Sequence, residues 1–129
     1  MRWFLVALLA MLLAAPAAQA QQETVTVSVN RAVELVDEDT VRVTTTVTCT
    51  SGADVLEAFL YVVQRQGNQF LNSEFAFFSP ICDGTPHTFT VTVEAGEGQT
   101  FRRGRASVSS FVLLTSGAST SPSDPVIIR

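Results

Sequence analysis

Residues 40–50 alternate between inward and outward positions in a way that strongly constrains the fold. One row holds the mainly apolar side chains, and the other holds arginine and threonine; the first row is Val41, Val43, Thr45, Val47 and Cys49. Successive side chains of a β-strand point to opposite faces, so a period of two predicts a strand with one buried face. Cys49 is therefore expected on the core side of a strand.

Similar segments, separated by turn residues, fill the remainder of the chain after residue 20. Turn signals recur about every 8–12 residues, and no segment has a helical period, which favours an all-β fold. We expect about seven to nine strands in an antiparallel two-sheet sandwich of the immunoglobulin-like kind. Residues 115–125, rich in Ser, Thr, Gly and Pro, are expected to form a long hairpin loop or an irregular connection. The other expected strands are 24–29, 32–36, 55–66, 69–71, 75–78, 87–93, 105–114 and 126–128.

The N-terminus has the features of a secretory signal peptide. Arg2 precedes an apolar run over residues 3–15, Pro16 ends it, and Ala18-Gln19-Ala20 supplies the small residues of a cleavage site. The run is shorter than the roughly 20 apolar residues of a membrane span. A buried N-terminal helix does not account for the cleavage site. We therefore predict a signal peptide over residues 1–20 and a single domain over 21–129. The product is expected to be extracellular, or periplasmic if the host has an outer membrane, with no membrane partner after cleavage.

The only two cysteines are Cys49 and Cys82. In an exported chain, two thiols have one intramolecular pairing, so we predict a disulfide that locks two layers of sheet. Closing the loop from Cys49 to Cys82 stabilises the fold by about 4 kcal/mol at most in the chain-entropy model. The alternative, a reactive thiol pair, needs a C-x-x-C spacing or a setting that lowers the thiol pKa, and the sequence has neither.

The charge balance argues against nucleic acid and anionic membranes as partners. The chain has 8 arginines, no lysine and 12 acidic residues, so loss of Arg2 gives 7 − 12 = −5. Binding to phosphates needs clustered cations. Arg102, Arg103 and Arg105 form the only basic cluster, and successive strand residues point to opposite faces, so we expect these arginines to pair with acidic turns.

The chain resembles immunoglobulin-like sandwiches of secreted bacterial proteins, particularly small single-disulfide domains of unknown function from actinobacteria. The resemblance covers nearly all of residues 24–114. It rests on the strand ending in Cys49, the long strand ending at Gln64, the Cys82-Asp83-Gly84 loop and the strand start at 104–108. The chain departs from antibody domains because residues 55–66 contain no tryptophan and Cys82 precedes the 87–93 strand. The resemblance implies the sandwich but no function, because this fold hosts many.

No motif indicates catalysis, a cofactor or a metal, and we predict no residue for any of these roles. His87 is the only histidine, and the chain has no G-x-S-x-G motif, so His87 is expected simply to begin a strand. One histidine and two oxidised cysteines cannot build a tetrahedral zinc site. A carboxylate cluster could in principle bind calcium but lacks the spacing of a calcium loop, so a solvated turn is the preferred interpretation. That cluster is Glu34, Asp37, Glu38 and Asp39.

The 55–66 segment is apolar on both faces, which raises the question of what covers its second face. With Leu56, Ala58, Leu60 and Val62 facing the core, a second row must face elsewhere; this row is Phe59, Tyr61 and Val63. The preferred interpretation is that residues 70–78 cover this row. The alternative is a contact surface for a partner protein or for self-association, since exposed apolar area on a secreted protein commonly marks an interface.

These observations favour a secreted, non-catalytic binding or structural module, not an enzyme. One alternative is an inhibitor of an extracellular enzyme that uses the disulfide-pinned loop 77–86, because a pre-organised loop loses less entropy on binding. Another is a carrier of a small apolar ligand, with a pocket lined by Phe75, Phe77, Phe78 and Phe89.

Overall fold

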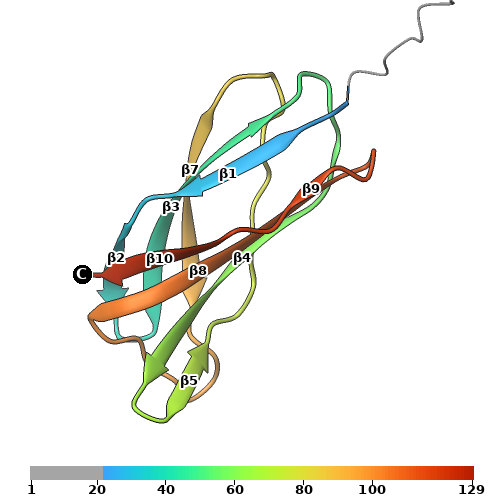
Figure 1. Cartoon of the computed structure of the whole chain (residues 1–129). Helices are drawn as coiled ribbons and strands as arrows, with labels where there is room; N and C mark the ends of the chain where they lie inside the picture. The colour runs from blue at the N-terminus through green and yellow to red at the C-terminus, as the bar shows by residue number, and fades with distance from the viewer. Residues whose placement is uncertain (1–21) are drawn as a thin grey trace, which may run out of the picture.

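The structure is a computed structural model that describes residues 22–129, so the predicted signal peptide, residues 1–20, lies outside the described residues. The described chain is all-β, as predicted, and contains no helix (Figure 1). It therefore has no helix with the length and apolar character needed to cross a bilayer. The strands are β1 (Val25–Val29), β2 (Ala32–Asp37), β3 (Thr40–Cys49), β4 (Val55–Gln66), β5 (Gln69–Asn72), β6 (Ala76–Phe77), β7 (His87–Glu94), β8 (Gly104–Leu114), β9 (Ser119–Thr120) and β10 (Ser123–Ile128).

The described residues form ten strands, which exceeds the predicted seven to nine, because residues 115–125 are more ordered than expected. Ser119 pairs with Leu113, which makes β9 a short partner of β8. β10 begins at Ser123 and includes Pro125, opposite Ser107 of β8. Ser110 N donates to Pro122 O, so by the alternation of the ladder the N–H position of residue 125 points away from β8. On the other side β2 pairs only with the last two residues of β10, so proline is tolerated at residue 125.

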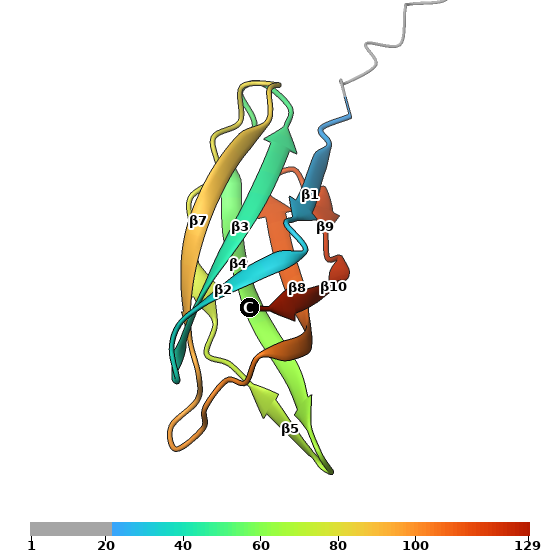
Figure 2. The same ribbon diagram turned by 90° about the vertical axis from the view of Figure 1, so that its left-hand side faces the viewer.

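The strands form one continuous hydrogen-bonded path in the order β1-β3-β2-β10-β8-β4-β5. Off this path, β7 pairs with β3, β6 with β4 and β9 with β8. β2 links the region of β1, β3 and β7 to the region of β10, β8 and β4, since it pairs antiparallel with β3 and parallel with β10. Figure 2 shows β7 and β3 on one side of the molecule and β8 and β10 on the other.

The core fills the space between these two regions, and the alternation of residues 40–50 explains the side chains that β3 contributes to it. Every member of the inward row of β3, from Val41 to Cys49, is buried, which confirms the prediction for this strand. The same alternation predicts inward rows of Phe89, Val91 and Val93 in β7 and of Ala106, Val108, Ser110 and Val112 in β8, and both rows face the core. The main cluster joins Val41, Val43, Val91 and Val93 of β3 and β7 to Leu60, Val62, Val108, Val126 and Ile128 of β4, β8 and β10.

The predicted inward row of β4 is wrong at Leu56, whose side chain is 65% exposed. The register with β8 shifts between Val55, opposite Leu114, and Glu57, opposite Leu113, so Leu56 is an extra residue in a β-bulge. A bulge turns the side chains before it relative to those after it. The rest of the predicted row, from Ala58 to Val62, is buried as expected.

Gln64 continues the inward row of β4, and its role could not be expected from the sequence pattern. Its side chain is 2% exposed. The amide Nε2 donates to Arg102 O at 2.7 Å, and the Oε1 atom accepts from Arg102 N at 2.9 Å, so the buried amide fixes the loop before β8. The predicted pairing of Arg102, Arg103 and Arg105 with carboxylates is not formed. The only arginine–carboxylate ion pair within residues 22–129 joins Arg42 and Glu34 at 3.4 Å.

The predicted disulfide between Cys49 and Cys82 is present, with an S–S distance of 2.02 Å. The prediction that it locks two layers of sheet needs a correction, because the bond joins the end of β3 to a connecting segment and not to a second strand. Cys82 lies in the connection between β6, which pairs with β4, and β7, which pairs with β3. The bond therefore holds this crossing connection against the end of β3. Gly84 N donates to Cys49 O at 2.9 Å, and Gly52 N donates to Cys82 O at 3.2 Å, so backbone bonds fix the same junction.

Candidate functional site

Aromatic side chains gather on the side of β4 that faces away from the core, and strand register brings them together. Phe59 of β4 lies opposite Phe77 of β6 and opposite Phe111 of β8. Its ring centroid lies 5.8 Å from that of Phe77 and 5.3 Å from that of Phe111. Phe75, just before β6, lies 4.9 Å from Phe59 and 5.4 Å from Tyr61 by the same measure. We call these five residues the aromatic face.

The aromatic face is covered in its centre and open at its surface. Phe59, Tyr61 and Val63 are half-buried, and Phe75 and Phe77 lie against Phe59, so residues 70–78 supply part of the expected cover. The covering rings are themselves exposed, Phe75 by 59% and Phe77 by 68%. The segment therefore moves the apolar surface outward without removing it.

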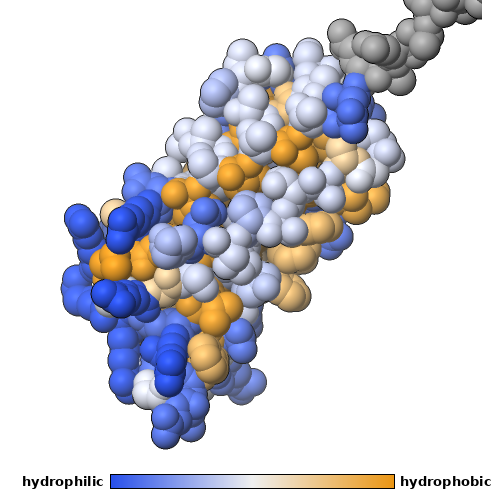
Figure 3. Space-filling view, viewed as in Figure 1, coloured by the Kyte–Doolittle hydropathy of each residue, from blue (hydrophilic) through white to orange (hydrophobic). Residues whose placement is uncertain are grey.

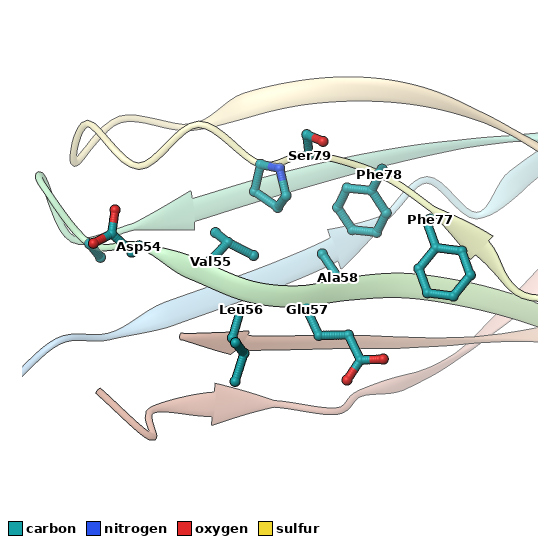
Figure 4. Close-up of a pocket in the computed structure, with 10 residues that line it drawn as sticks. Asp54, Val55, Leu56, Glu57, Ala58, Phe77, Phe78 and Ser79 are labelled. Atoms are coloured by element: carbon teal, nitrogen blue, oxygen red, sulfur yellow. The ribbon is translucent and has the colours of Figure 1, made fainter. Parts of the chain in front are cut away.

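A groove of about 700 Å³ continues from the aromatic face along the edge of β4. One wall is residues 53–58 and the other is residues 77–80, where the chain leaves β4 after the Phe78 N to Ala58 O bond of 3.2 Å. Figure 4 shows the side chains of Val55 and Ala58 on one side of β4 and those of Leu56 and Glu57 on the other. The bulge at Leu56 produces this arrangement.

The four phenylalanines of the predicted carrier pocket are divided between two environments. Phe75 and Phe77 lie on the aromatic face. Phe78 and Phe89 are half-buried, lie 5.9 Å apart between ring centroids and pack against the core clusters. The neighbours Phe77 and Phe78 differ because successive residues of an extended chain point to opposite sides. The structure does not bring the four together in one pocket.

The loop next to the disulfide contains a hydrogen-bonded cluster that was not foreseen from the sequence. His87 begins β7, as predicted, and its Nε2 lies 2.7 Å from Asp83 Oδ2 and 3.3 Å from Thr85 Oγ1. Thr85 Oγ1 donates to Asp83 Oδ1 at 2.6 Å. In a catalytic triad the carboxylate and the hydroxyl contact different ring nitrogens. Here both contact Nε2, so the cluster closes a loop and does not activate the hydroxyl.

The cluster gives the loop a measurable pH response. Hydrogen bonds from the side chain and backbone N–H of Thr85, and then the bond to His87, lower the pKa of Asp83 to about 2. Because the folded pKa is below the unfolded value near 3.9, the stabilisation is present above about pH 4 and is lost as pH falls through about 2. NMR titration of the Asp83 carboxyl carbon should give a midpoint of about 2, and Thr85→Val should raise it toward the ordinary value.

Thr90→Val is the control for the Asp83 titration, because Thr90 is an exposed threonine on β7. It should leave the midpoint where it is. An equal midpoint in Thr85→Val and the unaltered protein would show that Thr85 does not hold the carboxylate.

Three of the four carboxylates weighed as calcium ligands have other partners in the structure. Glu34 pairs with Arg42, and Asp37 Oδ1 accepts from Asp39 N at 3.1 Å within the β2–β3 turn. This turn lowers the pKa of Asp37, chiefly through its hydrogen bonds with Asp39. Over residues 22–129, no group of three or more His, Cys, Asp or Glu side chains is placed to share a metal ion.

No protein-family model matches the chain, and no curated protein matches it at a significant level. The function must therefore be inferred from the geometry of the aromatic face, the groove and the disulfide-bonded loop.

Proposed function

We propose that this protein is a non-catalytic binding module that acts outside the cytoplasm, in the medium or in a periplasm, and that it binds a protein through the aromatic face. The observation that carries the proposal is the exposure of Phe75 and Phe77 above Phe59, on the outer side of a sheet. Aromatic residues are enriched in the buried centres of protein interfaces. The disulfide is consistent with an extracellular location.

We further propose that the fold is an immunoglobulin-like two-sheet sandwich. Support comes from the core, in which residues of β3 and β7 pack against residues of β4, β8 and β10. The parallel pairing of β2 with β10, next to an antiparallel β8–β10 pair, is consistent with an N-terminal strand that changes sheets. In such sandwiches, binding surfaces lie on an outer sheet face or in the loops at one end.

The aromatic face is tested by Phe77→Asp, with Phe70→Asp as the matched control. Both phenylalanines are well exposed, Phe77 by 68% and Phe70 by 60%, but Phe70 lies on β5 outside the aromatic face. The immobilised protein should capture a partner from the host's own medium. Phe77→Asp should reduce capture about tenfold or more, and Phe70→Asp should leave it unchanged. Equal capture by all three proteins would overturn the proposal.

A specific observation also favours the inhibitor function, which would use the connection between β6 and β7. This connection carries Ile81, which is 52% exposed, next to Cys82, and the disulfide and two backbone bonds hold it. A rigid loop with an exposed apolar side chain is suited to enter a pocket of an enzyme. Capture that survives Phe77→Asp and is lost in Ile81→Asp would assign binding to this loop. A dimer on size-exclusion chromatography that Phe77→Asp converts to a monomer would assign the aromatic face to self-association.

A further inference from the structure

We infer that the groove beside β4 binds an extended, positively charged peptide segment of the partner, which adds to the sheet as a strand. This inference rests on the proposed binding function and names the kind of partner segment. Within residues 22–129, no strand pairs with the edge of β4 between Val55 and Ala58, because β6 ends at Phe77 and pairs only with Phe59 and Leu60. Residues 77–80 form the far wall of the groove there. An exposed strand edge is a template for strand addition.

The backbone groups of Val55 point into this groove. Leu114, opposite Val55, donates its N–H to Ala118 O at 2.8 Å, on the side of β8 away from β4. Val55 and Leu114 are therefore a non-hydrogen-bonded pair of the antiparallel ladder, in which the two residues direct their N–H and C=O groups away from each other. The N–H and C=O of Val55 therefore point away from β8, and they form no backbone hydrogen bond across the groove within residues 22–129.

Ala58 supplies a second free donor at the other end of the groove. Its C=O accepts from Phe78 N, so its N–H points to the same side, yet this N–H has no backbone partner on Phe78. An extended peptide placed here would bond to Val55 and Ala58, which span about four residues, or about 14 Å of strand. Free N–H and C=O groups along a strand edge are the groups to which an added peptide strand bonds.

The two sides of the groove favour different side chains on the peptide. On the inner side lie Val55, Ala58 and the half-buried ring of Phe78, and all three are apolar. On the outer side lie Leu56 and Glu57, both exposed. Because alternate residues of a strand face opposite sides, the peptide should alternate apolar residues with residues that favour a carboxylate.

The negative charge at the end of the molecule that holds the groove favours a cationic partner. The end is built from residues 22–30, 46–60, 78–90 and 109–124, which contain five carboxylates and no arginine or lysine. On the face that Figure 3 shows, coloured by hydropathy, the strongly hydrophilic side chains gather mainly toward the opposite end, where β5 lies. Neither Asp54 nor Glu57 forms an ion pair within the described residues. Two copies joined through this edge would bring these carboxylates together, so a second copy is disfavoured.

The test uses a ten-residue peptide of alternating lysine and valine, with blocked ends, added to the ¹⁵N-labelled protein. The amide signals of Val55 and Ala58 should shift, and binding should weaken as the salt concentration rises. A peptide with glutamate in place of lysine should bind at least about tenfold more weakly, and so should one with N-methyl groups on alternate residues.

Val55→Pro and Val55→Ala form the matched pair of variants. Proline removes the Val55 N–H, which faces the groove and takes no part in the β4–β8 ladder, whereas alanine retains it. Both variants lose the valine side chain, so Val55→Pro should bind the lysine–valine peptide about tenfold more weakly than Val55→Ala does. The N-methylated peptide tests the same backbone bonds without altering the protein, should Val55→Pro fail to fold.

Three results would overturn the inference: no shift at Val55 and Ala58, equal binding of the N-methylated peptide, or shifts at these two amides that depend on protein concentration and indicate a second copy. None of these would affect the proposed function if Phe77→Asp still reduces partner capture about tenfold or more. Loss of the aromatic-face result with retained peptide binding would instead refute the proposed surface and leave the groove.

Discussion

Replacing both Cys49 and Cys82 with alanine is expected to lower the free energy of unfolding by about 4 kcal/mol. The two residues are 33 positions apart, and opening a loop of this length restores entropy to the unfolded chain by that amount in the chain-entropy model. The loss is a large share of the 5–15 kcal/mol typical of a small domain. Alanine is the suitable replacement because Cys49 is only 1% exposed, and a hydroxyl there would be buried without a partner.

Urea denaturation followed by circular dichroism measures this loss, and the chemically reduced protein is the comparison. The reduced protein should unfold at nearly the same urea concentration as the double alanine variant, since both lack the same constraint. We expect the loop between β6 and β7 to lose its fixed conformation first, because the bond holds this connection rather than a strand pair. A loss below about 1 kcal/mol would contradict the entropic account.

Leu60→Ala and Leu56→Ala should differ by about 3 kcal/mol although both lie in β4, four residues apart. Leu60 is fully buried in the main core cluster, and truncating such a leucine typically costs about 2–5 kcal/mol because it leaves a cavity. Leu56 is 65% exposed on the far side of the bulge, so its truncation should change stability by no more than about 0.5 kcal/mol.

The same denaturation measurement tests this pair, with Leu113→Ala as a further control. Leu113 is a half-buried leucine of β8 opposite Glu57, and its loss should fall between the other two. Similar losses for Leu56→Ala and Leu60→Ala would mean that the regular alternation runs through the whole of β4 and that the bulge is absent in solution.

The candidate site was only partly accessible to sequence reasoning. The second apolar row of β4 identified Phe59 and Tyr61 as residues in need of cover, and both lie in the aromatic face. Phe111 could not be assigned to this surface, because its position beside Phe59 depends on the register between β4 and β8. The bond between Asp83 and His87 was missed as well, although their spacing of four residues is local, because it depends on a loop that the disulfide holds.

The sequence by itself determined where most of the strands lie, which side chains of most strands turn inward, and that the two cysteines pair. These properties follow from a period of two and from turn residues, which act between near neighbours in the chain. The tertiary structure alone decided that β2 joins β3 to β10, that a bulge turns Leu56 outward, and that a strand edge stays open beside Pro80. Each of these depends on which distant segments meet and in what register, and a local pattern does not carry that information.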